Sequence, residues 1–442
     1  MTRSKVFLLI FLLCFLAAAF IRVSNNFKFI PAGGYDASGH LSYIYQMKSG
    51  WDIPLANEGW STFHPPLYYF LMAGIWKALG EKSPWPVHVI FRIVSTLLNL
   101  AIAMLVLLCI NLLWPEQYLT SILGICFILF VPVHIYTSSM IGNEQLTAFL
   151  ISTDLWLLIL YMQKPRLRSL MAILMGVFSG LALLSKYTGI LILITIVICL
   201  FQRIIFNDGH RKKHVFSLLT VILICFLISG GYYVRNMLFF GNPFVLGQDY
   251  PFIAKVMNEQ PPGERQLSDF FGFDFRTFYD PIIRNPGGSI PISRSRYVWS
   301  LVYSNFWFDS MAHFLLLKSD PWRQRIGTIL LWLGIFPIVL FILEAGKETA
   351  INFRERMNTS TFPLLVLLLL NLISFIIFNI KTPHFSAGKA SYFLASSVPI
   401  AVFMALGTQR FFQKGMVLKM IGLFLLILIF GLSSAAFFLT YT

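Results

Sequence analysis

The chain has 442 residues, of which 57% are hydrophobic and only 12% are charged. An average soluble domain has about 25% charged residues, so this composition excludes a soluble globular protein. The formal net charge is +15, but the Lys and Arg residues lie in short loops between apolar runs, where they orient a membrane protein. We therefore expect membrane lipids, and no nucleic acid, as partners.

Apolar runs recur along the whole sequence, and about 18 residues are enough for one helix to cross a bilayer. The predicted transmembrane helices cover residues 6–23, 88–113, 118–138, 145–162, 169–185, 188–206, 214–233, 326–345, 361–380, 390–407 and 415–438. These eleven spans predict an all-α, polytopic membrane protein with a single domain over residues 1–442.

The first apolar run follows Arg3 and Lys5 and ends in three alanines, as a secretory signal peptide does. It covers residues 6–21, which is long for a signal, and the next segment is the richest in candidate site residues. We therefore predict an uncleaved first helix. The five cysteines all lie inside apolar runs, which predicts packed thiols rather than disulfides or a metal site.

A shorter apolar stretch at residues 65–80 decides the orientation of the chain. If it does not cross and the N-terminus is cytoplasmic, every dense basic segment faces the cytoplasm, as the positive-inside rule requires. Those segments are 164–168, 203–214, 347–356 and 410–414. We therefore predict that 65–80 lies in or dips into the outer interface, where protein or a wet cavity covers its backbone.

The external face then carries two long connections, residues 24–87 and 235–296. The first contains an acidic residue and two histidines within short motifs. The second is rich in Pro, Gly, Asp and Arg, and a loop of that length is usually functional or partly helical. We expect it to form short helices that cover a site at this face.

Six short motifs follow one another at the predicted external ends of the helices. They are Gly33-Gly34-Tyr35-Asp36, His64-Pro65-Pro66-Leu67-Tyr68-Tyr69, Gly142-Asn143-Glu144-Gln145-Leu146, Ser185-Lys186-Tyr187-Thr188-Gly189, Val234-Arg235-Asn236 with Gly241-Asn242-Pro243-Phe244, and Gly388-Lys389-Ala390-Ser391-Tyr392. Their order resembles that of the GT-C glycosyltransferases, in particular the protein O-mannosyltransferases and the bacterial aminoarabinose transferases that act on lipid A. This chain departs from that branch where Ala37 follows the first acid, where Glu144 replaces a frequent Asp, and where Ser391 replaces a common Arg.

The resemblance implies a GT-C-like helical bundle with external interfacial helices. It also implies an enzyme that moves a sugar from a polyprenyl-phosphate carrier to a lipid, glycan or protein acceptor. Asp36 is then the expected general base, which takes the proton of the attacking hydroxyl. Glu144 is the expected second catalytic acid, which positions the acceptor or a metal. The site faces away from the cytoplasm, and the absence of an appended soluble domain favours a bacterial plasma membrane.

Such a reaction needs cations, because negative charge develops on the leaving phosphate. The residues expected to bind the donor phosphate are His64, Lys186, Arg235 and Lys389. Tyr35, His40 and Arg92 are expected to support the site, with Arg92 paired to Asp36 or Glu144.

Simpler interpretations exist for these residues. Asp36 precedes a helical stretch and is a candidate N-cap, while Glu144 gains from the dipole of the helix that it begins. The ring nitrogens of His64 can be hydrogen-bonded by a neighbouring group without any catalytic role. Lys186 and Arg235 lie at helix ends, where long side chains reach the headgroups.

Cofactors and competing functions stay open. No glycine-rich phosphate cradle is present, so a nucleotide-sugar donor is not expected. Asp36, His40, His64 and Glu144 offer ligands, but no spacing requires a divalent metal. A transporter or flippase of a lipid-linked or anionic substrate is one alternative, although no repeated halves are visible; a polysaccharide polymerase or ligase is another. Asp154, in the middle of a span, is expected to have an internal partner.

Overall fold

The fold is that of a computed structural model, which describes residues 3–79, 83–206, 209–284, 289–315 and 321–439. Within these ranges the chain is helical and forms no β-strand. The α-helices are α1 (Arg3–Lys28), α2 (Ala37–Gly50), α3 (Leu67–Leu79), α4 (Val87–Leu113), α5 (Tyr118–Phe130), α6 (Pro132–Thr137), α7 (Glu144–Gln163), α8 (Arg168–Ser185), α9 (Ile190–Phe206), α10 (Arg211–Phe240), α11 (Pro251–Asn258), α12 (Ile292–Ser295), α13 (Val298–Trp307), α14 (Pro321–Leu333), α15 (Ile335–Arg354), α16 (Phe362–Lys381), α17 (Ser397–Gln413) and α18 (Met416–Phe437). Short 3-10 helices are η2 (Pro165–Leu167), η3 (Tyr187–Gly189), η4 (Gly247–Asp249), η5 (Leu267–Phe270), η6 (Phe275–Phe278), η8 (Phe385–Gly388) and η9 (Ala390–Ser396).

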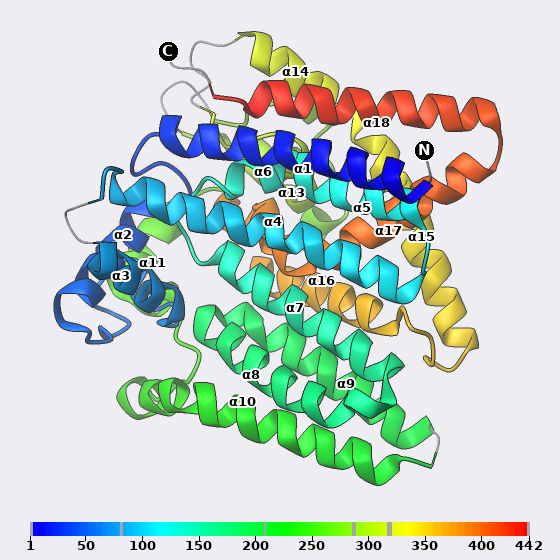
Figure 1. Cartoon of the computed structure of the whole chain (residues 1–442). Coiled ribbons are helices and arrows are strands. Elements are labelled where there is room, and N and C mark those ends of the chain that lie inside the picture. The colour runs from blue at the N-terminus through cyan, green and yellow to red at the C-terminus, as the bar shows by residue number, and fades with distance from the viewer. Residues whose placement is uncertain (1–2, 80–82, 207–208, 285–288, 316–320, 440–442) are drawn as a thin grey trace.

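Ten stretches of described helix are long and apolar enough to cross a membrane. They coincide with ten of the eleven predicted spans, so the predicted class, an all-α polytopic membrane protein, is confirmed. The predicted span 326–345 is part of a longer stretch, Pro321–Arg354, and the predicted span 390–407 belongs to Phe385–Gln413. In Figure 1 the long helices run side by side across the picture, and the two chain ends lie at opposite ends of the bundle.

The eleventh predicted span, 118–138, is wrong as a single helix. It is divided into α5 and the short α6, with Val131 in an extended conformation between them. Pro132 is the physical reason, because it has no backbone N–H to give to the carbonyl of Ile128 one turn earlier. Arg22 on α1 supplies the missing donor: its guanidinium bonds the carbonyls of Ile128 at 3.1 Å and Leu129 at 2.8 Å.

A polar chain leads from this helix break toward the first residue of α7. The Nε of Arg22 donates to Asn99 Oδ1 at 3.2 Å, and Asn99 Nδ2 in turn donates to Gln145 Oε1 at 3.3 Å. Gln145 then donates to the hydroxyl of Thr137 at 2.9 Å. These side chains are buried within apolar helices, where an unpaired polar group would be costly, so the network fixes α1, α4, α6 and α7 relative to one another.

Helices α8 and α10 pack closely because two glycines one turn apart face the partner helix. A Cβ on Gly176 would lie 2.8 Å from Ile224, and one on Gly180 would lie 2.8 Å from Ile228. Small residues at this spacing allow close approach of membrane helices. On the same α8, Ser179 donates to the buried carboxyl of Asp154 at 2.5 Å, so the internal partner expected for Asp154 is present.

The predicted non-crossing stretch 65–80 corresponds to α3, whose 13 residues extend only about 20 Å. That is short of a hydrocarbon core of about 30 Å. Helix α3 packs with α2, and Figure 1 shows both beside α11 at the left end of the bundle. We call this end the site end.

The five cysteines are free thiols.

Candidate active site

Asp36 lies at the junction between the end of α1 and the start of α2, in strained backbone. Its φ is 52°, in the left-handed region, and Gly34, two residues earlier, has φ 115°. Left-handed backbone is uncommon for residues other than glycine, although Asp tolerates it better than most, and such strain clusters at functional sites. Asp36 occupies the N-cap position of α2, but among the described residues its carboxylate makes no side-chain capping bond to this helix, so capping does not account for the carboxylate.

The Asp36 carboxylate instead faces an indole and a lysine. Trp60 donates its ring N–H to Oδ1 at 3.0 Å, and Lys389 Nζ lies 3.6 Å from Oδ2. Burial by itself would raise the pKa of Asp36, but Lys389, followed by His40, Trp60 and His64, outweighs burial and holds the pKa well below its usual value. The side chain is still 44% exposed. It is therefore ionised at neutral pH and open to a ligand.

Glu144 forms the second carboxylate–lysine pair of the site. It is the first residue of α7, and Lys186 at the end of α8 donates to its Oε1 at 2.9 Å. Gly142 makes room for this carboxylate, because a Cβ there would lie 2.5 Å from Glu144 Oε2 and 3.4 Å from His40 Nε2. A side chain at position 142 would therefore displace the Glu144 carboxylate from its present position.

Two histidines connect the carboxylates. The rings of His40 and His64 stack with centroids 5.6 Å apart, and His40 Nδ1 lies 2.8 Å from the hydroxyl of Tyr69. Burial lowers the pKa of both histidines, and Asp36 and Glu144 oppose that shift in each of them. Both imidazoles are therefore neutral at pH 7. In their protonated forms both imidazoles interact electrostatically with Asp36 and with Glu144, so the two carboxylates belong to one cluster.

Tyr35, one of the predicted supporting residues, forms a further wall of the cluster together with His313, which the sequence did not predict. Lys389 Nζ lies 4.4 Å above the Tyr35 ring, and the His313 ring meets Tyr35 edge-on with centroids 4.7 Å apart. Burial first, and then Lys389 and Arg284, lower the pKa of His313 to about 3, whereas Asp36 opposes the shift. His313 is therefore a neutral hydrogen-bonding group beside the Asp36–Lys389 pair.

Asp309 holds His313 in place. Its buried carboxylate accepts backbone N–H bonds from His313 at 3.2 Å, Phe314 at 2.7 Å and Leu315 at 2.8 Å. Burial raises the pKa of Asp309 to about 6, although the three N–H groups favour its ionised form. The carbonyl of the neighbouring Ser310 accepts a hydrogen bond from the backbone N–H of Ile283 at 3.0 Å. This bond places Ile283, and with it the next residue Arg284, close to Asp309.

Arg92 does not pair with Asp36 or Glu144, and this expectation is corrected. Its guanidinium donates to four backbone carbonyls, those of Asn26, Phe29, Ile30 and Pro31. These carbonyls lie at and beyond the end of α1, where a helix leaves its last acceptors without internal donors. Arg92 therefore supports the site indirectly, because it fixes the chain between α1 and Asp36.

Arg92→Leu is expected to lower the free energy of unfolding by about 2–4 kcal/mol, since each buried carbonyl without a donor costs about 1–3 kcal/mol. The midpoint of thermal unfolding in detergent measures this effect. Lys77→Leu is the control, because Lys77 is an exposed cation that lies 4.5 Å from the Trp51 ring. Equal midpoints for the two variants would contradict the role given to Arg92.

Arg235 lies apart from the two carboxylates. Its guanidinium donates to the carbonyl of Ile53 at 2.8 Å and that of Pro54 at 3.2 Å. It therefore ties the end of α10 to the connection that precedes α3. After it, Gly241 ends α10 with φ 68°, which explains the glycine of that motif. Of the predicted phosphate-binding residues, the structure gathers His64, Lys186 and Lys389 around the carboxylates and leaves Arg235 at their margin.

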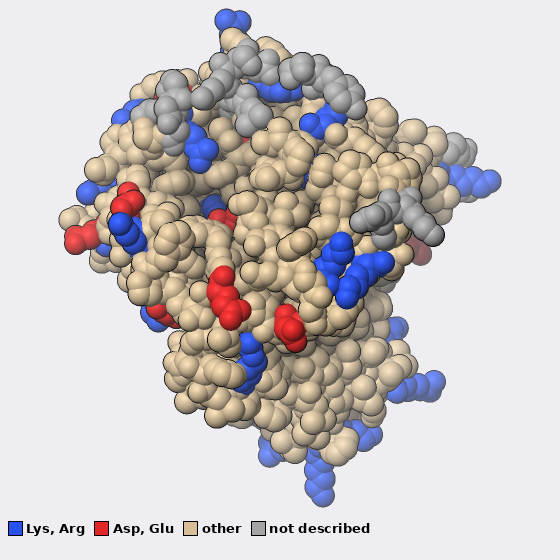
Figure 2. All heavy atoms as spheres, turned by 90° about the vertical axis from the view of Figure 1, so that its left-hand side faces the viewer, with Lys and Arg blue, Asp and Glu red and all other residues tan. Residues whose placement is uncertain are grey.

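Two small hollows share Glu144 in their walls. One is lined also by Tyr35 and Gln145, the other by Lys186 and Tyr392. Figure 2 shows the site end of the bundle, where acidic and basic side chains interrupt an otherwise uncharged surface. No group of three or more His, Cys, Asp or Glu side chains in the described part of the chain is placed to hold a metal ion.

Comparison with known proteins identifies relatives of this chain. Residues 63–229 match the family model of the dolichyl-phosphate-mannose-protein mannosyltransferases, and this part contains His64, Glu144 and Lys186. No curated protein matches. The match covers less than half of the chain.

Solved structures share the fold. The oligosaccharyltransferase of Archaeoglobus fulgidus in its apo form matches with a TM-score of 0.56 and 14% identity, over 98% of this chain and 56% of that one. ArnT from Cupriavidus metallidurans bound to undecaprenyl phosphate matches with a TM-score of 0.56 and 13% identity, over 96% of this chain and 63% of that one. The chain thus spans less than two thirds of the length of these structures. The predicted resemblance to the GT-C glycosyltransferases is confirmed.

Proposed function

We propose that this protein is a membrane glycosyltransferase that moves a sugar from a polyprenyl-phosphate carrier to a hydroxyl or similar nucleophile of an acceptor. The observation that carries the proposal is the cluster in which Asp36 and Glu144 each pair with a lysine and share two neutral histidines. The match to a mannosyltransferase family supports the same class of reaction. The fold is also that of structures solved with undecaprenyl phosphate and with a dolichol-phosphate, which supports the class of carrier.

Asp36 is the proposed general base. Its carboxylate takes the proton of the acceptor hydroxyl while that oxygen forms a bond to the anomeric carbon of the sugar. The bond between this carbon and the phosphate oxygen breaks, and its electron pair leaves with the polyprenyl phosphate. Asp36 is suited to this role because it is ionised and partly exposed in the free protein. Its proton passes to water when the glycosylated acceptor leaves.

Lys389 and Lys186 are the proposed partners of the donor phosphate. Both cations belong to the cluster, and a cation fixed near the leaving group stabilises the charge that develops there. The Lys389–Asp36 separation of 3.6 Å is longer than a charge-assisted hydrogen bond, typically about 2.7–2.9 Å. Lys389 is therefore free to turn toward a phosphate. His40, His64 and His313, which are neutral, donate or accept hydrogen bonds with the sugar or the phosphate.

We further propose that the site faces away from the cytoplasm. Glu144 begins α7 at the site end, so Gln163 ends this helix at the opposite end of the bundle. The basic residues Lys164, Arg166 and Arg168 follow it there, as the positive-inside rule requires of a cytoplasmic end. Single cysteines at Lys212 and Glu264, probed with a membrane-impermeant thiol reagent on intact cells, test this orientation. Labelling at 264 alone is expected, and labelling at 212 alone would reverse it.

The test of the function is a donor-consumption assay. Purified protein is incubated with a radiolabelled polyprenyl-phosphate sugar and a membrane extract that supplies acceptors. Release of free polyprenyl phosphate together with transfer of the label is expected. Movement of the intact donor between leaflets of a vesicle, with no cleavage, would instead favour the alternative of a flippase. The family-model match does not favour that alternative.

A further inference from the structure

Four large apolar side chains point away from the protein in the connection between α11 and α12. Leu267 is 75% exposed, Phe271 82%, Phe275 72% and Tyr279 71%. They recur at every fourth residue through η5 and η6, and we call them the apolar strip. A row of exposed large apolar residues on a connection is unusual for a surface that faces only water, and such patches mark interaction sites.

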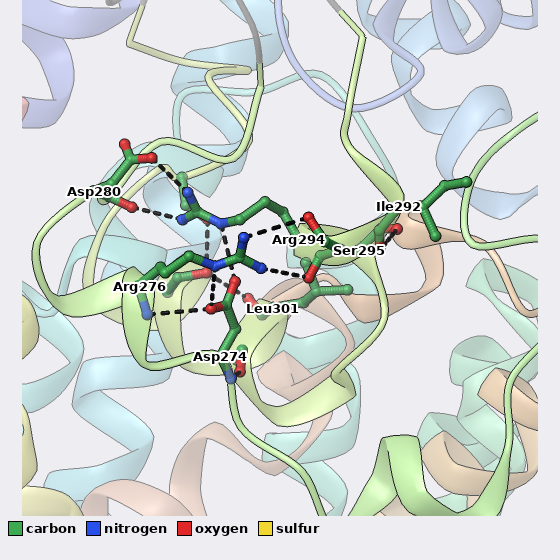
Figure 3. Close-up of polar contacts among 11 residues, drawn as sticks. Asp274, Arg276, Asp280, Ile292, Arg294, Ser295 and Leu301 are labelled. Carbon is green, nitrogen blue, oxygen red and sulfur yellow. Dashed lines mark hydrogen bonds and ion pairs between the residues drawn. The ribbon is translucent and has the colours of Figure 1, made fainter.

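A layer of ion pairs behind the apolar strip holds it in place. Asp274, which is buried, pairs with Arg276 at 2.8 Å and with Arg294 at 3.0 Å, and Arg294 also pairs with Asp280 at 2.5 Å. Figure 3 shows these side chains converging between the two arms of the connection. Since both partners of the Asp274–Arg294 pair are buried, the pair is costly to break. The apolar strip is therefore held outward by its support and is not simply a loose loop.

Packed aromatic rings connect the apolar strip to a lipid-facing ring of a membrane-spanning stretch. The Phe275 ring lies 5.5 Å from that of Phe273, which lies 5.7 Å from that of Phe278. Phe278 in turn lies 4.6 Å from Trp332. Trp332 belongs to the span Pro321–Arg354 and is 58% exposed, so its ring faces lipid. The row of aromatic rings thus leads from the hydrocarbon-facing side of α14 to the apolar strip.

We propose that the apolar strip rests in the interface of the bilayer leaflet at the site end and anchors this connection to the membrane. Aromatic side chains are enriched at this depth, where an apolar ring meets hydrated headgroups. The occupant of the strip is the lipid, because packed rings link the strip to Trp332, whose exposed ring lies on a membrane-spanning stretch. The same connection continues to Ile283, which bonds the Ser310 carbonyl next to Asp309. The bilayer surface thereby positions the wall of the site that carries His313, whatever reaction the site performs.

Site-directed spin labelling in lipid nanodiscs tests the anchor. A nitroxide is attached to Phe271→Cys or Phe275→Cys after the five native cysteines are replaced by alanine. Both side chains are largely exposed, so a label fits at the surface; position 271 is the primary site, because the Phe275 ring also contacts Phe273. Trp332→Cys is the lipid-facing reference. Glu264→Cys is the matched control, since Glu264 is exposed on the same connection but lies outside the apolar strip.

The measurement is the ratio of collision rates with oxygen, which concentrates in lipid, and with a water-soluble nickel chelate. At 271 and 275 this ratio is expected to exceed that at 264 severalfold and to approach that at 332. A ratio at 271 and 275 equal to that at 264 would place the apolar strip in water and overturn the proposal. Labels shielded from both reagents would mean that protein covers the strip, which overturns it as well.

Discussion

Asp36→Asn is expected to reduce sugar transfer by about 10²–10⁴-fold, which is the usual contribution of general acid–base catalysis. The amide oxygen can still accept the Trp60 N–H that Asp36 accepts at 3.0 Å, so the local structure is kept. An amide cannot take up the proton of the acceptor hydroxyl at neutral pH. The measurement is the rate of release of polyprenyl phosphate at saturating donor, with donor binding followed separately and expected to change only a few-fold.

Asp52→Asn is the matched control for this variant. Asp52 is an exposed acid in the same connection between α1 and α3, and the same change of charge there should leave the rate within about twofold, because surface substitutions away from a site have small effects. Full activity of Asp36→Asn would remove the base from the proposed mechanism. Loss of donor binding together with turnover would instead assign Asp36 to substrate binding.

The sequence predicted most of the helices because a membrane span can be recognised from its length and hydropathy alone. It failed at residues 118–138, where the apolar run is continuous but Pro132 removes one hydrogen-bond donor. That failure was predictable in part, since proline interrupts helices. What the sequence could not show is that Arg22, more than a hundred residues earlier, would bond the freed carbonyl and so make the break tolerable inside a membrane.

The candidate site was predicted where residues stand in short motifs and missed where they do not. Asp36, Glu144, Lys186 and Lys389 were identified from motifs, and the structure gathers them in one cluster. Arg92 was assigned the wrong partner. Its guanidinium binds four backbone carbonyls, and because every residue has a carbonyl, the sequence does not indicate which ones lie near Arg92.

The roles of Trp60, Asp309 and His313 in the cluster could not be found from the sequence. Asp309 and His313 lie in a segment without a motif, and Trp60 is one of ten tryptophans. Their relation to Asp36 depends on long-range packing alone. The one local signal is a pair of polar residues four positions apart, Asp309 and His313, near an apolar stretch. Such a pair is commonly structural, with the buried carboxylate accepting hydrogen bonds from the backbone of its own turn.

The pairing of each carboxylate with a lysine has a mechanistic consequence. A carboxylate that is strongly stabilised by a cation is always ionised but is a weak base, since catalysis is most efficient when the pKa of the base lies near the working pH. If a donor phosphate draws Lys389 away from Asp36 and adds negative charge beside it, the pKa of Asp36 rises in the complex. Asp36 then becomes a stronger base only when the donor is bound. It therefore does not take the proton of an acceptor hydroxyl when there is no sugar to transfer.

This coupling predicts how the pH dependence of transfer responds to loss of Lys389. In the free protein Lys389 holds the pKa of Asp36 well below its ordinary value of about 3.9, so activity that needs ionised Asp36 persists to low pH. Lys389→Met removes a charge that favours the ionised form, so the pKa must rise. The acid limb of kcat/KM for the donor, which reports the free enzyme, is therefore expected to move to higher pH.

Lys389→Met is also expected to lower kcat on the pH plateau by about 10²–10³-fold, as removal of one charge-stabilising group does in other active sites. Lys186→Met is the matched control, because Lys186 pairs with Glu144 at 2.9 Å and is not among the groups that hold down the pKa of Asp36. It should lower the plateau as well but leave the acid limb in place. In the wild type the acid limb of kcat should lie at higher pH than that of kcat/KM. In Lys389→Met this separation should be smaller, because only the charge of the donor phosphate remains to raise the pKa of Asp36 in the complex. Equal displacement of the limb in both lysine variants would show that charge in general, and not Lys389, sets the basicity of Asp36.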